Sequence, residues 1–253
     1  MTVTELYRKL NERIPPSLSC SWDNDGLMCC PEPEREVGRV LIALDVTAKV
    51  ADLAIREGYD VILSHHPLLF HPVKAMEPGN AVAAKTIRLL RAGVAVMSFH
   101  TRLDAVAGGV NDTLAALLGL RDVTPFGEEG IGRIGTLPQA VSLEAFANLV
   151  RKVTGAPRIV AADAGKPVLR VAVLGGSGSD DVPLAEAAGA DTYLTGELAH
   201  HHLADAPEHG MNLLAAGHFH TEHPVCETLA KMVAALAKNV KITVVSSDEV
   251  KVL

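Results

Sequence analysis

Two segments of this 253-residue chain repeat one pattern, and the repeat limits the possible folds more than any other feature. In each segment an apolar strand leads to a helix, a glycine ends the helix, and a second apolar strand follows. The first segment comprises Arg39–Leu44, Ala48–Glu57, Gly58 and Val61–Ser64. The second comprises Arg170–Leu174, Pro183–Ala188, Gly189 and Thr192–Thr195.

The two segments align without a gap. Matching pairs are Arg39 and Arg170, Val40 and Val171, Leu53 and Leu184, Ala54 and Ala185, Gly58 and Gly189, Asp60 and Asp191, and Leu63 and Leu194. Further along, Val94–Phe99 followed by His100 corresponds to Asn212–Gly217 followed by His218. We interpret the pattern as an internal duplication. Chance similarity is the alternative, because apolar strands and glycines after helices recur in many βαβ units.

Strands that alternate with helices predict an α/β fold with two similar lobes and mostly parallel sheets. A boundary is expected near Pro125–Gly135, which is rich in glycine and acidic residues. We therefore expect residues 1–125 and 216–253 to form the first lobe and residues 126–215 to form the second, a pseudo-repeat of the first. Lys241–Ser246 is expected to be the last strand.

Histidines and carboxylates follow the ends of these strands. A His-x-x-x-carboxylate pattern occurs twice, from His100 to Asp104 and from His218 to Glu222, and the pair His65–His66 follows a predicted strand. Imidazole and carboxylate together suit divalent zinc, iron, manganese or nickel. Ligands of parallel sheets bind beyond the carboxyl ends of the strands, so we predict a metal site between the lobes.

One tetrahedral ion needs about four ligands. The predicted metal ligands are His65, His66, Asp104, His218 and Glu222, with His100 adjacent. These residues are enough for two ions if one carboxylate bridges the two ions, so we predict a dinuclear centre.

Each of these signals also has an ordinary structural interpretation. The His65–His66 pair could form a turn with hydrogen bonds to backbone. Asp104 and Glu222 could be acids in the first turn of a helix. Among the neighbouring motifs, His200–His202 could line the site or form a solvated helix face, and Gly175–Gly178 could cradle an anionic group or make a tight turn. The segment Trp22–Leu27 is expected to be a polar turn that packs Trp22 on the core.

Composition narrows the class of protein. The net charge of −7 argues against a general nucleic-acid binder, so a small-molecule substrate is the better expectation. No apolar run reaches the roughly 18 residues of a membrane span, and the first residues do not form a signal peptide. We expect a cytoplasmic protein whose four cysteines are reduced thiols.

Six ordered motifs run nearly from end to end of the chain. They are S-W-D-N-D-G-L at 21–27, D-V-I-L-S-H-H-P at 60–67, H-T-R-L-D-A at 100–105, G-G-V-N-D at 108–112, G-A-D-T-Y-L-T-G-E at 189–197 and A-G-H-F-H-T-E at 216–222. With these motifs the chain resembles the Nif-three-like family of dinuclear metal-centre proteins, often named GTP cyclohydrolase I type 2 homologues. The resemblance implies metal ligands at His65, His66, Asp104, His218 and Glu222. It also implies a toroidal homohexamer, a trimer of dimers.

The leading functional hypothesis is a metal-dependent hydrolase in which two ions about 3.5 to 4 Å apart activate a water. His100 is the expected general base or acid. If the substrate is GTP, water attacks the carbon between the two nitrogens of the purine imidazole ring and formate is released. The amides of Gly176–Gly178 and the side chain of Arg102 are candidate donors to the triphosphate. The alternatives are a phosphoesterase or amide hydrolase and a non-catalytic metal-binding scaffold or chaperone.

Overall fold

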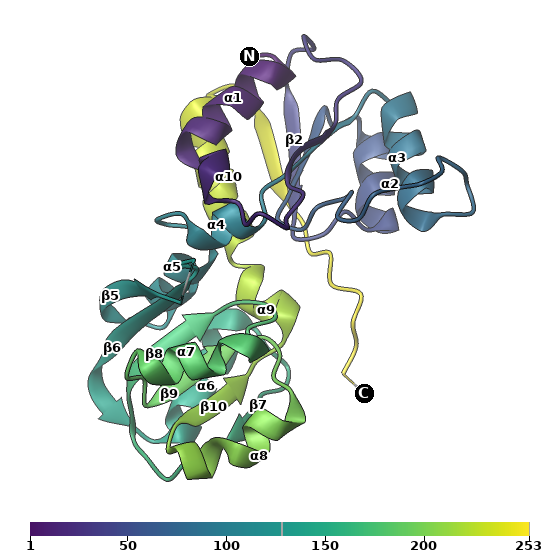
Figure 1. Ribbon diagram of the computed structural model, residues 1–253. Coiled ribbons are helices and arrows are strands. Elements are labelled where there is room, and N and C mark those ends of the chain that lie inside the picture. Colours follow the sequence, from purple (N-terminus) through teal and green to yellow (C-terminus); the bar gives the residue numbers. More distant parts are fainter. Residues whose placement is uncertain (128, 253) are drawn as a thin grey trace. The chain divides into compact units, whose positions relative to one another are not determined.

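The chain folds into two compact α/β units. The computed structural model describes residues 1–127 and 129–252, and each unit has its own β-sheet (Figure 1). The first unit combines Met1–Val106 with Cys226–Glu249, and the second comprises Ala107–Val225 and the segment from Val250. The chain thus starts in one unit, builds the other, and returns.

The sheet of the first unit has five strands in the order β1-β4-β3-β2-β11. Four of them are parallel neighbours, and β1 pairs antiparallel with β4 at one edge. The strands are β1 (Gly26–Cys29), β2 (Arg39–Ala43), β3 (Val61–Ser64), β4 (Ala95–Ser98) and β11 (Lys241–Val244). β3 and β4 are buried along their whole length, as expected for central strands covered on both faces.

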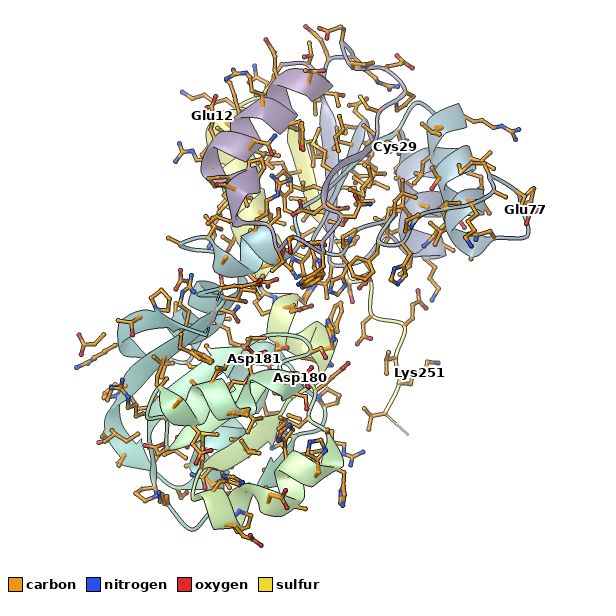
Figure 2. All side chains as sticks on the ribbon, in the orientation of Figure 1. Glu12, Cys29, Glu77, Asp180, Asp181 and Lys251 are labelled. Atoms are coloured by element: carbon orange, nitrogen blue, oxygen red, sulfur yellow. The ribbon has the colours of Figure 1, made fainter. Side chains whose placement is uncertain are left out.

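Helices cover both faces of this sheet. They are α1 (Val3–Arg13), a 3₁₀ turn at Pro16–Leu18, α2 (Ala48–Glu57), α3 (Ala81–Arg91), α4 (Thr101–Ala105) and α10 (Val225–Leu236). α2 and α3 pack together on one face, where Val50, Ala54 and Leu89 join the strand residues in one core. α1 and α10 lie on the other side of the sheet (Figure 1). Cys29 of β1, labelled in Figure 2, is buried at the edge of the α2–α3 core.

The sheet of the second unit has six strands in the order β5-β6-β8-β9-β10-β7. β8, β9 and β10 are parallel, while β5, β6 and β7 pair antiparallel. The strands are β5 (Arg121–Phe126), β6 (Gly132–Val141), β7 (Val160–Ala162), β8 (Val168–Leu174), β9 (Thr192–Thr195) and β10 (Asn212–Ala215). The antiparallel strands therefore flank a parallel centre.

The helices of the second unit also lie on two faces. They are α5 (Val110–Leu117), α6 (Leu143–Thr154), a 3₁₀ turn at Ser179–Asp181, α7 (Val182–Ala187), α8 (His200–His209) and α9 (His218–Glu222). Phe146 and Val150 of α6 share one core with Leu114 of α5. Ala185 of α7 and Ala206 of α8 belong to a separate core on the other face. Each unit thus buries enough apolar surface to form its own core.

The internal repeat is visible in the hydrogen bonds of the two units. The Oδ2 atom of Asp60 accepts from the backbone N–H groups of Gly38 and Arg39, each at 2.8 Å. In the second unit, Asp191 accepts in the same way from Leu169 and Arg170. Both aspartates start the second strand of the repeat, after a glycine with positive φ. The two segments therefore share specific hydrogen bonds as well as a pattern of apolar residues, which supports a duplication rather than a chance similarity.

The third strand of the repeat aligns one residue differently from the sequence prediction. Equivalent backbone hydrogen bonds run from Ala95 to Asp60, from Asn212 to Asp191, from Phe99 to Ser64 and from Ala216 to Thr195. The structural equivalent of His100 is therefore Gly217, and the predicted equivalence of His100 and His218 is wrong by one residue. His100 precedes α4, whereas His218 is the first residue of α9.

The limits of the units differ in position from those expected. The stretch 125–135 lies in the hairpin of β5 and β6, apart from residue 128, which is outside the described residues. Residues 107–125 and 216–225 belong to the second unit. The physical reason is packing, because β5 pairs with β6 and Leu114 of α5 joins the second unit's core.

Candidate metal centre

Three histidines gather at the carboxyl ends of β3 and β4 in the first unit. His65 and His66 follow β3, and His100 lies between β4 and α4. The two strands are parallel with Ser64 opposite Ser98, so residues just beyond them reach the same edge of the sheet. One ring nitrogen from each histidine lies within 4.8 Å of the others. The ring centroids are 5.0 to 5.7 Å apart.

Each of these imidazoles is held through its Nδ1 atom. Nδ1 of the buried His65 lies 2.9 Å from the carbonyl oxygen of Phe99. Nδ1 of His66 lies 2.7 Å from Asp45 Oδ1, and Nδ1 of His100 lies 2.9 Å from Asp23 Oδ1. A carbonyl or carboxylate oxygen only accepts, so all three Nδ1 atoms carry hydrogen. Neutral rings of this tautomer place their lone pair on Nε2, as in histidines that bind metal ions.

Asp104 adds a carboxylate to this group. It belongs to the short helix α4 that starts directly after His100, and its Oδ1 atom is 3.6 Å from Nε2 of His65. Its side chain is largely buried. A carboxylate beside imidazole nitrogens is the donor combination that zinc, iron and manganese accept.

The segment Trp22–Leu27 holds His100 in place. Oδ2 of Asp23 accepts from the backbone N–H and the hydroxyl of Thr101, while Oδ1 contacts His100. Burial raises the pKa of Asp23, but its hydrogen bonds with His100 and Thr101 outweigh burial and lower the pKa to about 2. Asp23 is therefore an anion at neutral pH, and its two oxygens are engaged by His100 and Thr101. The sequence did not assign Asp23 a role, because its partners lie far away along the chain.

Arg102 serves the fold rather than a substrate. Its side chain is buried, and it donates to Asp25 Oδ2, to Asn11 Oδ1 and to the carbonyl oxygen of Ile14. These contacts tie α4 to α1. The prediction that Arg102 donates to a triphosphate is therefore wrong, because its guanidinium faces partners inside the unit.

In the second unit, His218 and Glu222 lie one helical turn apart on α9. His218 Nε2 is 3.1 Å from Glu222 Oε2, and His218 Nδ1 is 3.1 Å from Glu197 Oε1. The side chain of Glu222 is buried, whereas that of Glu197 is exposed. His218 thus shares the Nδ1–oxygen contact of the first unit's histidines, and its Nε2 lies near a carboxylate as that of His65 does.

The Gly175–Gly178 turn makes room for these ligands. A Cβ atom on Gly176, which has φ of +71°, would lie 2.1 Å from Glu222 Oε1, and one on Gly175 would lie 3.1 Å from Glu222 Cγ. The amides of Gly175, Gly176 and Gly178 donate to Asn111, Thr221 and Thr195. The predicted use of the Gly176 and Gly178 amides as phosphate donors is therefore wrong, because protein oxygens take both.

Gly196 explains why the second unit has no histidine at the position of His65. It occupies the position of His65, and a Cβ atom there would lie 2.5 Å from the carbonyl oxygen of Gly176 and 2.8 Å from Cα of His218. No side chain fits at this point. Glu197 occupies the position of His66, so the second unit places a carboxylate where the first places an imidazole.

His200–His202 form the start of α8, a different helix from the one that carries His218 and Glu222. His201 and His202 line a pocket with Glu186 and His209 over the α7–α8 core. Among the described residues, none of these histidines belongs to a group of three close ligand atoms. The location of His200–His202 on α8 therefore does not support the alternative in which they line the metal site.

Two exposed aromatic side chains lie beside His100. Trp22 is 61% exposed and Phe70 38% exposed, so Trp22 does not pack into the core as predicted. The ring of His100 lies 6.2 Å from Trp22 and 5.7 Å from Phe70, both edge to face. The two aromatic rings also contact each other at 6.3 Å. Exposed aromatic rings beside a group of histidines are typical of a ligand-binding surface.

A comparison with protein families decides what kind of protein this is. The family model Duf34/NIF3 (NGG1p interacting factor 3) matches residues 1–251. The chain belongs to this family. The resemblance drawn from the sequence motifs is thereby confirmed, and the α/β fold with two sheets is that of the solved relatives.

Several relatives of this Duf34/NIF3 chain are similar along nearly their whole length. A GTP cyclohydrolase 1 type 2 homolog of Clostridium perfringens is 33% identical over 232 residues, covering 89% of this chain and 88% of the relative. The Protein NIF3 homolog of Schizosaccharomyces pombe is 31% identical over 269 aligned positions, covering 97% and 96%. A crystal structure of a Staphylococcus aureus hypothetical protein superposes with a TM-score of 0.89 at 26% identity, covering 100% of this chain and 99% of that one.

A solved archaeal structure is also similar to the Duf34/NIF3 chain. Reduced HcgD from Methanocaldococcus jannaschii has a TM-score of 0.84 and 29% identity, with 98% of both chains covered. Among the described residues, no helix has the length and apolar character needed to span a bilayer.

Proposed function

We propose that this Duf34/NIF3 protein binds divalent metal ions and uses them in a hydrolytic reaction. The observation that carries the proposal is the set of four histidines whose Nδ1 atoms all contact an oxygen. His65 contacts a carbonyl oxygen, and His66, His100 and His218 contact carboxylates. Histidines that only support a fold have no reason to share one tautomer and one orientation. Histidines that bind metal ions commonly share this arrangement, because an oxygen partner at Nδ1 raises the basicity of Nε2.

The proposed ligands are His65, His66 and Asp104 in the first unit and His218 and Glu222 in the second. Three imidazoles and two carboxylates supply enough donors for two ions, and zinc, iron, manganese and nickel all accept them. That the two sets share one dinuclear centre stays a prediction of the sequence. The absence of cysteine from the set favours borderline metals over those that need thiolate.

A bound divalent ion would supply Lewis acidity and lower the pKa of a water in its coordination shell. Protein side chains would accept the proton of this water and donate it to the leaving group. His100 is the proposed general base or acid, since Asp23 holds its Nδ1 hydrogen and leaves Nε2 to exchange a proton. The anionic Asp23 would fix the tautomer and the orientation of this imidazole, as the buried aspartate does in a Ser-His-Asp triad.

The exposed rings of Trp22 and Phe70, which we call the aromatic rim, support a substrate with a planar ring. Trp22 and Phe70 both lie beside His100 and contact each other edge to face, so a planar heterocycle could stack on one of these exposed rings and contact the edge of the other. The curated relatives named GTP cyclohydrolase 1 type 2 homolog are consistent with a nucleotide substrate. A purine ring held there would stand beside the proton-transfer group.

We also propose that the protein forms a homohexamer, arranged as a trimer of dimers, and acts inside the cell on a small molecule. Support for the hexamer comes from the resemblance of its motifs to the Nif-three-like family, and support for a small-molecule substrate comes from the net charge of −7. Light scattering coupled to gel filtration tests the assembly directly. A mass of six chains is expected, and a monomeric mass would overturn it.

The first test measures metal per chain by plasma mass spectrometry and then measures turnover on the same sample. The substrates are GTP, followed by formate release, and chromogenic phosphate esters and anilides. Two ions per chain and turnover are expected. Asp104→Asn should lose both metal and turnover, and His100→Gln should keep the metal but lose turnover. Asp205→Asn on the exposed face of α8 is the matched control and should retain both.

The outcomes separate the candidate functions. Formate release assigns a cyclohydrolase, whereas release of phosphate or aniline assigns another hydrolase. Two retained ions without turnover on any substrate would favour a non-catalytic metal-binding scaffold. A chain that binds no ion after addition of zinc, manganese or iron would contradict the proposal itself.

A further inference from the structure

The segment after β11 returns to the edge of the sheet that carries the histidines. Ser247 is 5% exposed, whereas the neighbouring Ser246 is exposed. The Ser247 hydroxyl oxygen accepts from the backbone N–H of Asp45 at 3.0 Å and donates to Asp45 Oδ2 at 3.1 Å. Two hydrogen bonds from one hydroxyl thus fix both the backbone and the carboxylate of Asp45.

Asp45 connects this contact to the candidate metal ligands. Its Oδ2 atom binds Ser247, and its Oδ1 atom lies 2.7 Å from Nδ1 of His66. A carboxylate with one oxygen held by a hydroxyl has little freedom to rotate, so the other oxygen keeps its direction toward the imidazole. The hydroxyl therefore sets the orientation of the His66 ring through one intermediate residue.

Further contacts fix the segment that carries Ser247. Val245 N–H donates to the carbonyl oxygen of Ile42 at 2.9 Å, which continues the pairing of β11 with β2. Glu249 forms an ion pair with Lys49 of α2. The buried Ser247 lies between these two attachments, so its position is determined on both sides.

We infer that Ser247 is a positioning residue of the metal centre, acting on His66 through Asp45. The inference rests on the proposed metal function and assigns to the C-terminal segment a role in metal affinity. Asp45 is the outer partner of His66, and losing such an outer contact typically weakens metal binding about 10- to 100-fold. Ser247 holds Asp45 in place, so its loss is expected to act through the same contact.

The test is a double-mutant cycle on metal affinity, measured by competition with a chromogenic zinc chelator. Ser247→Ala is expected to weaken zinc binding about 10-fold. In an Asp45→Ala background the same substitution should change zinc affinity less than twofold, because the residue through which it acts is gone. Ser246→Ala is the matched control, and it should leave zinc affinity unchanged. Circular dichroism checks that every variant is folded.

A loss of affinity that is the same in both backgrounds, or no loss from Ser247→Ala, would overturn the inference. A second measurement separates it from the metal proposal. In metal-free protein, the ¹⁵N-resolved Nδ1–H resonance of His66 should be protected from exchange in the native chain and exposed in Ser247→Ala. If the chain binds no metal but this resonance behaves as expected, the positioning contact stands and the metal function fails. If the resonance is unchanged in the variant, the contact does not position His66.

Discussion

Asp60 and Asp191 hold equivalent positions in the two units, and each carboxylate accepts hydrogen bonds from two successive backbone N–H groups at the start of the neighbouring strand. The contact joins the first two strands of each repeat unit. Asp60 has one further partner, Arg35, at 2.8 Å. In both units, an aspartate thus accepts hydrogen bonds from backbone N–H groups that would otherwise be unpaired where a strand begins.

This equivalence predicts similar losses of stability. Asp60→Ala and Asp191→Ala each remove an anionic acceptor from two backbone donors, and we expect each to lower the unfolding free energy by about 3 kcal/mol. Urea denaturation followed by circular dichroism measures the loss. Asp52→Ala, on an exposed face of α2, is the control and should cost less than about 1 kcal/mol. A loss no larger than that of the control would contradict a shared structural role.

Gly176 and Gly165 offer a matched pair of substitutions. Both have φ of +71°, but a Cβ atom on Gly176 would lie 2.1 Å from Glu222 Oε1, whereas nothing lies within 4 Å at Gly165. Either change to alanine should cost about 1 to 2 kcal/mol of backbone strain. Only Gly176→Ala should also displace the Glu222 carboxylate and lower the metal content. Thermal unfolding and plasma mass spectrometry on the same samples separate strain from ligand loss. Equal metal content in the two variants would count against Glu222 as a ligand.

Trp22 is the single tryptophan of the chain, so its fluorescence reports on the aromatic rim alone. Guanosine and GTP are expected to quench it in a saturable manner, because a stacked purine ring would contact the indole. Ribose 5-phosphate and tripolyphosphate lack a planar ring and should leave the emission unchanged. Phe70→Leu should weaken quenching by guanosine several-fold without changing metal content. Quenching by tripolyphosphate equal to that by GTP would show that the phosphates, not the ring, bind near Trp22.

The elements of the repeat could be predicted from local sequence, because local signals determine them. α2 spans Ala48–Glu57 as expected, since Thr47 caps its first turn and Gly58 adopts the left-handed conformation that ends it. The strands β3 and β9 also begin and end where their apolar runs do. The antiparallel strands β1, β5, β6 and β7 lie outside the repeat, and their pairing depends on residues distant in sequence.

The positions of the candidate site histidines could also be predicted from local signals. The residues that support these histidines could not. His65, His66 and His100 follow parallel strands, whose ends meet at one sheet edge. Asp23, Asp45 and Ser247 act through contacts with residues far along the chain, and no local pattern encodes them. The one-residue error at His218 has a similar origin, since only the backbone hydrogen bonds of β10 reveal its register.

Asp181 provides a pH-dependent test of the second unit. It lies beside Asp180 just before α7, where Figure 2 labels both residues. Burial raises the pKa of Asp181, and the nearby carboxylates of Asp180 and Glu129 raise it further. A carboxyl whose pKa is raised by folding stabilises the folded state fully below its unfolded value of 3.8, and this stability is lost as the pH rises through the folded-state pKa.

We therefore expect Asp181→Asn, which cannot ionise, to raise the melting temperature at pH 7 and to change it little at pH 3.5. The gain should grow steadily between these values, because the native carboxyl becomes charged across that range. Asp180→Asn is the control, and its gain should have the same sign but a smaller size, since Asp180 is exposed and acts only by repulsion. Calorimetry at half-unit steps of pH measures both curves. A gain for Asp181→Asn that is constant with pH would show that packing, rather than ionisation, causes the effect.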